Sequence, residues 1–438
     1  MSHLITRRTA LGVGSAAILA TLAACGSSKS NGSSGSQATV GTDAEVELTF
    51  AGWSLDTTPE FQALADAFTA ANPNITITVK EYSAQDYDTQ LTTDLSAGSA
   101  PDVFPIKNLL RYYYYMSNGQ LMDLSDMAAG FDGDEAIDLT YLEYDSKYFA
   151  LPYRQDSWLL FYNKDAFAQA GVEEPDGSWT WEDYKQAASK ITAAGEMKGA
   201  YHHTWQSVVQ GFALAQYPDA DLTSGDYSYL KPFYETALEM QDSGDVETFA
   251  TAQAQSLTYQ AQFGTQKAAM MPMGSWFIAT LLEQQSTGDA DEFEWGLAPI
   301  PQYESGHEDA PITFGDPTSL AVNAALEGDK ASAAKAFVAF ATGEEGARAM
   351  AAIGITPAYF SETIESTFFD LDGMPQDDLS KLAFSTHDTR PENPVSETVN
   401  DIQTILNDTH SEIMTATTPV DEALSKAGED IKGQGLTA

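Results

Sequence analysis

The stretch LPYRQDSWLLFYNKDAF at residues 151–167 places polar side chains directly before an apolar run. Residues 158–162 are aromatic or aliphatic without a break, which predicts a short buried strand. Arg154, Gln155 and Asp156 stand at the entrance of that strand, and two of the three are charged. Hydrogen-bonding groups in this position make the stretch the first candidate for a functional site.

Three tryptophans stand at the predicted ends of secondary-structure elements. Trp53 follows the first predicted strand, at the carboxyl end where open α/β sheets bind ligands. Trp205 and Trp276 each stand near a transition from a loop to a helix. One such tryptophan alone favours core packing, because tryptophan is mostly buried. Three of them at element ends are harder to explain by core packing alone.

Motifs for catalysis are absent from the sequence. It contains no glycine-rich phosphate loop, no HExxH and no nucleophile elbow. His202 and His203 are adjacent, so their side chains point apart and are poorly placed to share a metal. A pair of carboxylates for glycoside cleavage cannot be distinguished among 64 acidic residues. We therefore expect no catalytic residue, no metal and no cofactor.

Composition limits the classes of partner. The 438 residues carry 64 acidic and 21 basic side chains, a formal net charge of -43, and the acids are spread along the chain. Such a surface repels nucleic acid and anionic lipid headgroups. With 43% hydrophobic residues, the chain is long enough for two or three packed domains.

The N-terminus has the features of an export signal. Arg7 and Arg8 precede an apolar stretch at 11–24, which is too short to span a bilayer as a finished helix. Residues 22–25, Leu-Ala-Ala-Cys, resemble a bacterial lipobox, so we expect residues 1–24 to be a lipoprotein signal peptide and Cys25 to carry lipid. Residues 26–43 are mostly glycine, serine and other small or polar residues, which predicts a flexible tether. Export by the Sec or the Tat route stays open.

Periodicity in the rest of the chain predicts α/β architecture. A strand at 45–50, a helix around 61–68 and an alternating strand at 75–79 form a βαβ unit. The tyrosines of RYYYYM at 111–116 are interpreted as core residues, because a helix can turn only one or two of them in any single direction. Further predicted elements are helices at 87–95, 109–116, 181–191, 334–341 and 420–431 and a strand at 102–106.

Several motifs in order resemble the extracellular solute-binding proteins of carbohydrate ABC importers, the group with maltodextrin-binding-protein-like members. The resemblance covers the chain from about residue 45 to its end. It implies a type II periplasmic-binding-protein-like fold with two lobes, each a mixed sheet flanked by helices, and a sugar in the cleft between them. The expected lobes are 44–153 with 312–356, and 154–311 with 357–438. The motifs are the 151–172 segment beginning LPYRQDSW, SWTWEDY, KAAMMPMGSWF, APIP, GDPTSLAVN and GITPA.

The same resemblance implies which residues contact the sugar. Asp156 falls where a carboxylate accepts hydrogen bonds from sugar hydroxyls, and such charge-assisted bonds are strong. Trp276 falls where an indole covers the face of a pyranose ring. Arg154 either contacts the sugar or pairs with neighbouring acids, and Gln155 has the same two alternatives. The other expected contacts are Trp53 and Trp205, where this sequence departs from the maltodextrin binder, and Lys107, Asn108, Asp316, His387 and Asp388.

The resemblance implies a protein that binds and does not catalyse. We expect a monomer anchored by lipid to the outer face of the cell membrane, delivering a sugar or short oligosaccharide to ABC permease subunits. Nucleic acid is excluded as a partner by the charge. A surface glycoside hydrolase or lyase is one alternative, since it would share an aromatic groove and acidic residues. A binder of a charged solute with the same fold is the other.

Overall fold

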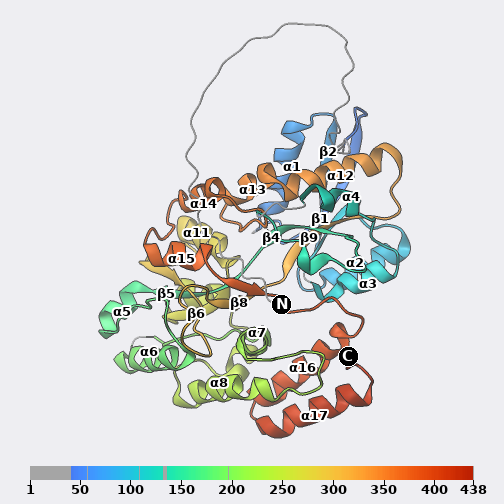
Figure 1. Cartoon of the computed structure of the whole chain (residues 1–438). Coiled ribbons are helices and arrows are strands. Elements are labelled where there is room, and N and C mark those ends of the chain that lie inside the picture. Colours follow the sequence, from blue (N-terminus) through green and yellow to red (C-terminus); the bar gives the residue numbers. More distant parts are fainter. Residues whose placement is uncertain (1–40, 57, 108, 132–135, 196, 438) are drawn as a thin grey trace.

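The computed structural model describes residues 41–56, 58–107, 109–131, 136–195 and 197–437. It is a mixed α/β structure built on two separate sheets and a short two-stranded ribbon. Figure 1 shows the strands β1, β4 and β9 in the upper part of the molecule and β5 and β6 in the lower part, each sheet with helices packed around it. The predicted α/β fold with two lobes is confirmed.

The first sheet has five strands in the order β2-β1-β3-β9-β4. β1 and β2 run parallel, and helix α1 connects them, which confirms the predicted βαβ unit. Phe61, Leu64 and Phe68 of α1 pack on this sheet at helical spacing, and Phe50 and Phe337 meet edge to face at 4.9 Å between centroids. The strands are β1 Val46–Trp53, β2 Ile75–Tyr82, β3 Val103–Ile106, β4 Leu151–Gln155 and β9 Pro317–Val322.

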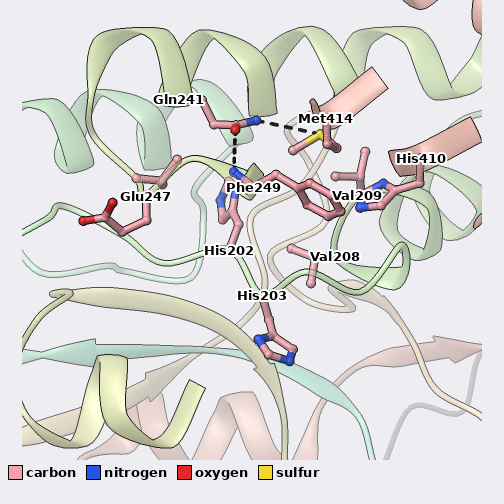
Figure 2. A pocket seen from close by; sticks show the side chains of 10 residues that line it. His202, His203, Val208, Val209, Gln241, Glu247, Phe249, His410 and Met414 are labelled. Carbon is pink, nitrogen blue, oxygen red and sulfur yellow. Dashed lines mark hydrogen bonds between the residues drawn. The ribbon is translucent and has the colours of Figure 1, made fainter. Parts of the chain in front are cut away.

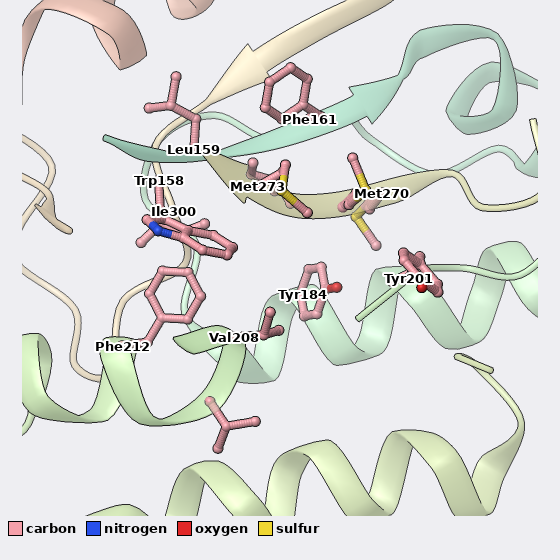
Figure 3. Close-up of a cluster of buried hydrophobic side chains, with 14 of the residues drawn as sticks. Trp158, Leu159, Phe161, Tyr184, Tyr201, Val208, Phe212, Met270, Met273 and Ile300 are labelled. Carbon is pink, nitrogen blue, oxygen red and sulfur yellow. The ribbon is translucent and has the colours of Figure 1, made fainter. Parts of the chain in front are cut away.

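The second sheet has three antiparallel strands in the order β6-β5-β7. All six residues of β5 are buried, as the uninterrupted apolar run predicted. Figure 3 shows Leu159 and Phe161 on one side of this sheet and Trp158, Tyr184 and Phe212 on the other, so both faces are covered. The strands are β5 Trp158–Asn163, β6 Met270–Gly274 and β7 Trp295–Ala298.

The chain crosses between the two sheets within a few residues at each passage. β4 ends at Gln155 and β5 begins at Trp158, while the return passage runs from β8, Ile312–Phe314, to β9. The two passages touch: a Cβ on Gly315 would lie 2.2 Å from the carbonyl oxygen of Asp156, so only glycine fits there. β8 pairs in parallel with β10, Asp388–Arg390. We name residues 155–157 and 315–316 the crossovers.

Helices surround both sheets, and several begin as the sequence predicted. Thr180 and Asp183 form a capping box at the start of α6, the helix predicted at 181–191. The predicted helix at 109–116 divides into a 3-10 turn and a short α-helix, in which Tyr112 and Tyr115 are buried and Tyr114 is exposed. The helices near the first sheet are α1 Glu60–Ala71, α2 Tyr87–Ala97, η1 Leu109–Arg111, α3 Tyr112–Ser117, α4 Ser125–Ala128, η2 Ala129–Phe131, η3 Thr140–Leu142, α12 Gly328–Thr342 and α13 Glu344–Ala351.

The remaining helices belong with the second sheet and its hydrophobic core. Ile312 and Phe314 of β8 pack in the core of the second sheet, so the return passage to the first sheet begins at Gly315. The assignment of chain segments to lobes stays a prediction. These helices are α5 Lys164–Ala170, α6 Trp181–Ala194, α7 Ser207–Gln216, η4 Ser228–Leu230, α8 Lys231–Ser243, α9 Phe249–Ala254, α10 Tyr259–Gly264, α11 Phe277–Thr287, α14 Glu362–Phe369, α15 Asp378–Ser385, α16 Val399–Met414 and α17 Val420–Gly433.

Candidate ligand-binding site

An aromatic cluster lies where the second sheet meets the first crossover. Trp158 begins β5, Trp276 caps α11 just after β6, and Trp205 precedes α7. The ring centroids of Trp158 and Trp276 are 5.5 Å apart, and those of Trp205 and Trp276 are 6.2 Å apart. Tyr259 packs on Trp205 at 5.7 Å, and His203 meets Trp205 edge to face at 4.4 Å. We call these five residues the aromatic cluster.

Burial within the aromatic cluster is graded. Trp158 is only 4% exposed and stands nearly perpendicular to both other indoles, so it backs them from the core. Trp205 is 41% exposed and Trp276 is half-buried, which leaves aromatic surface open to a ligand. A Cβ on Gly274 would come within 1.9 Å of the Trp276 ring, so the glycine allows this ring to lie flat on the strand end. The structure therefore brings together two of the three predicted tryptophans.

The polar residues before β5 form a buried network. Arg154 donates from Nε to Oδ2 of Asp156 at 2.6 Å and from Nη1 to the carboxylate of Glu60. Ser275 donates to the other oxygen of Asp156 at 2.8 Å, and Thr356 donates to Ser275 at 3.0 Å. Of the two roles left open for Arg154, pairing with acids is the one observed. We call Glu60, Arg154, Asp156, Ser275 and Thr356 the crossover network.

This network joins segments that are far apart in the sequence. Glu60 is fully buried at the start of α1 and also accepts a hydrogen bond from Tyr153 at 2.8 Å. Burial raises the pKa of Glu60, and the charge of Arg154 opposes that rise. Gln155 donates from Nε2 to the carbonyl oxygens of Asp156 at 3.1 Å and Gly315 at 3.4 Å, so it bridges the two crossovers. Asp156 is 7% exposed, and both of its carboxylate oxygens have protein partners.

Two predicted contacts of the first sheet lie side by side. The Nζ of Lys107 is 5.1 Å from the centroid of the Trp53 ring and donates to the carbonyl of Ala84 at 2.8 Å. Trp53 is the last residue of β1, because pairing with β2 continues to Tyr82. Burial lowers the pKa of Lys107, and the charge of Arg154 lowers it further, whereas Asp88 opposes both. Asn108 lies outside the described residues.

The remaining predicted residues gather around the return crossover. Asp316 accepts hydrogen bonds from the backbone N–H groups of Glu392 at 2.9 Å and Asn393 at 3.1 Å. Nε2 of His387 is 2.7 Å from the hydroxyl of Ser157 in the first crossover. Asp388 pairs with Arg390 at 3.2 Å within β10, so the predicted late loop contains a short strand. All three side chains thus have protein partners.

Glu392 is a candidate that sequence reasoning missed. It is half-buried and accepts a hydrogen bond from the hydroxyl of Ser207, two residues after Trp205. Burial raises the pKa of Glu392 to about 8, and the neighbouring charge of Asp316 adds to the rise. No local pattern distinguishes Glu392 from the other acids, because its partners come from distant segments. Tyr259 was missed for the same reason.

The adjacent histidines point apart, as Figure 2 shows. His202 lies 3.1 Å from the hydroxyl of Tyr184, and His203 lies 3.1 Å from that of Tyr201. Burial lowers the pKa of each to about 4, so both are neutral at physiological pH. The cavity that both histidines line measures about 10 Å³, room for one water molecule. Within the described ranges, no group of three or more His, Cys, Asp or Glu residues is placed to hold a metal ion.

Comparison with known proteins decides the family. A model of the bacterial extracellular solute-binding protein family matches residues 53–348. The chain belongs to this family. This solute-binding protein is 32% identical to a sugar transporter from Rhizobium etli crystallised in an open conformation, with a TM-score of 0.77 over 88% of this chain and 99% of that one.

Curated relatives match over shorter stretches. A protein of Brucella abortus named only as a binding protein is 28% identical over 60% of this chain, and the chain spans 64% of its length. An sn-glycerol-3-phosphate-binding periplasmic protein of Brucella abortus is 25% identical over 43% of this chain and 44% of its own length. Among the described helices of the solute-binding protein, none combines the length and the apolar character that a membrane crossing requires.

Proposed function

We propose that this solute-binding protein binds a sugar or short oligosaccharide between its lobes and delivers it to the permease of an ABC importer, with no chemical step. The observation that carries the proposal is the partly exposed indole pair of Trp205 and Trp276 beside the crossovers. Similarity to the Rhizobium etli sugar transporter over nearly its whole length supports it.

The chemistry of the aromatic cluster suits a carbohydrate. An indole face covers the C–H face of a sugar ring, and polar groups at the rim meet its hydroxyls. Burial raises the pKa of Tyr259, while a hydrogen bond with Trp276 and the charge of Arg154 lower it, so its hydroxyl stays protonated and can donate at neutral pH. Glu392 supplies a carboxyl group that accepts a hydrogen bond from Ser207, which lies two residues after Trp205 in the sequence. Trp53 and Lys107 are proposed as contacts from the other lobe.

Location and partners complete the proposal. Members of the family act outside the cytoplasm, and we propose that lipid on Cys25 holds this one at the outer face of the membrane as a monomer. Cys25 lies outside the described residues. The permease subunits are the proposed partners, because a sugar released by the binding protein needs a path through the membrane.

A thermal-shift screen against mono- and oligosaccharides tests the proposal. A ligand present at 100 times its dissociation constant adds about 2.7 kcal/mol to the free energy of unfolding. We expect at least one neutral sugar to raise the melting temperature and to be recovered intact after incubation. Recovery of cleaved oligosaccharide would instead favour the glycoside hydrolase or lyase. Absence of any shift across the panel would contradict the sugar class.

A further inference from the structure

The charge of Arg154 is compensated entirely from within the protein. Its guanidinium contacts two carboxylates, Glu60 from α1 and Asp156 from the first crossover, and its side chain is 9% exposed. The guanidinium thus has two carboxylate partners for its single positive charge. Glu60 contributes its charge from a fully buried position, where no ligand can touch it.

Hydrogen bonds join Arg154 to the aromatic cluster, because its partner Asp156 also accepts a hydrogen bond from Ser275, the residue before Trp276. Burial lowers the pKa of Lys107, and the positive charge of Arg154 lowers it further. Burial raises the pKa of Tyr259, and the charge of Arg154 opposes that rise. Lys107 stands beside Trp53 at the first sheet, and Tyr259 stands in the aromatic cluster of the second. A change in the charge around Arg154 is therefore felt at both of these residues.

We infer that Glu60 is a positioning residue that sets charge selectivity: by pairing Arg154 from behind, it makes the site favour uncharged ligands over ligands that carry a phosphate or another anionic group. The inference rests on the proposed function, since it concerns the same site. Relatives of this chain differ in the ligand for which they are named: one is named for sugar and another for sn-glycerol 3-phosphate, which carries a phosphate group.

The physical reason is the loss of an available cation. A guanidinium free of carboxylates binds phosphate oxygens in a bidentate arrangement and is a preferred phosphate ligand in proteins. Here Nε of Arg154 donates to Asp156 and Nη1 donates to Glu60, so both of these donors are engaged by carboxylates of the chain. Lys107 does not replace it, because its ammonium donates to the carbonyl of Ala84 and lies against the Trp53 ring.

Glu60→Gln is the direct test, because the amide keeps the shape of the side chain and removes its charge. Dissociation constants are measured by calorimetry at low salt for glucose and glucose 6-phosphate, and for glycerol and sn-glycerol 3-phosphate. We expect Glu60→Gln to improve the affinity for each phosphate ester relative to its neutral counterpart by about tenfold, the interaction of two unit charges about 12 Å apart at an effective dielectric of about 20. An unchanged ratio in a folded Glu60→Gln protein overturns the inference.

Two control variants separate charge selectivity from general effects. Glu429→Gln removes one negative charge from an exposed position on α17 and must leave the ratio unchanged. Tyr153→Phe removes the other hydrogen bond to Glu60 without a change in charge and must also leave it unchanged. A shift in the ratio as large in either control as in Glu60→Gln overturns the inference.

The wild-type protein decides the case if Glu60→Gln does not fold. It must bind glucose 6-phosphate and sn-glycerol 3-phosphate more weakly than their neutral counterparts, and equal or tighter binding of a phosphate ester overturns the inference. Failure of the proposed function is a separate outcome, in which no neutral sugar binds at all. In that case, a gain of sn-glycerol 3-phosphate binding in Glu60→Gln still supports the charge-selecting role of Glu60.

Discussion

The indole rings of Trp205 and Trp276 lie 6.2 Å apart between centroids and are inclined to each other by 54°. Two rings at this inclination cannot cover the same flat face, so each offers a surface of its own. Trp158 stands behind both and is itself buried, which fixes their orientation from the core. This arrangement is the physical basis of the proposed binding site.

The buried ion pair of Arg154 and Asp156 in the crossover network should contribute more to the free energy of unfolding than an exposed ion pair of similar length. Asp156→Ala removes one of the two carboxylates that pair with the buried Arg154 and leaves Nε of Arg154 and the hydroxyl of Ser275 without their acceptor, and breaking a buried ion pair commonly costs about 3 kcal/mol or more. Urea denaturation without ligand measures it. The matched control is Glu239→Ala, which breaks an exposed pair with Lys185 at a similar 2.7 Å and should cost less than about 1 kcal/mol. Equal effects of the two substitutions would show that Asp156 is not part of a stabilising network.

Protonation of Glu392 should couple stability to pH. Its pKa is raised from 4.5 to about 8 in the folded protein, so the native state holds a proton that the unfolded chain has released. The free energy of unfolding therefore falls as pH rises from about 4.5 to about 8, and levels off above. Glu392→Gln cannot titrate and should lose this part of the slope. Melting temperatures of both proteins across that range test it, and parallel curves would refute the assignment.

Local periodicity was enough to predict the elements that carry the fold. Strand β5, which follows the polar residues 154–156, was predicted from an unbroken apolar run, and helix α1 and the parallel pair β1 and β2 from helical spacing and alternation over a few residues. The continuation of β1 to Trp53 was not predicted, because it depends on pairing with β2 up to Tyr82. The end of a strand is set by the strand with which it pairs, and that strand lies elsewhere in the sequence.

The contacts of the site depend on distant partners in the same way. Glu60 and Arg154 are separated by 94 residues, and Asp156 and Ser275 by 119. No spacing rule connects such residues, so pattern alone left the partner of Arg154 open. The tryptophans were found because their residue type at element ends is unusual, whereas Glu392 is one acid among 64.

Ligand binding should close the two lobes. The chain crosses between the sheets at 155–157 and again at 315–316, and short crossovers of this kind act as hinges in periplasmic binding proteins. The radius of gyration in solution scattering should decrease at saturating sugar. A scattering curve that does not change, with binding confirmed separately by calorimetry, would argue against hinge closure.

Cys25 should determine membrane association. Cys25→Ser removes the atom that receives lipid, so the variant should appear in the soluble fraction or remain unprocessed. Ser27→Ala, two residues further along the proposed tether, is the matched control and should stay with the membrane. Membrane association of Cys25→Ser after normal processing would rule out the lipid anchor.

Calorimetric titration of Trp276→Ala tests the central claim most directly, with Trp276→Phe as the matched control. Truncation of an aromatic anchor commonly costs about 2 kcal/mol or more, so the affinity for the sugar found in the thermal-shift screen should fall at least about thirtyfold. Trp276→Phe keeps a ring on the same helix cap and should lose less. The melting temperature without sugar shows whether the variants fold. Near-parental affinity in a folded Trp276→Ala protein would contradict the proposed site.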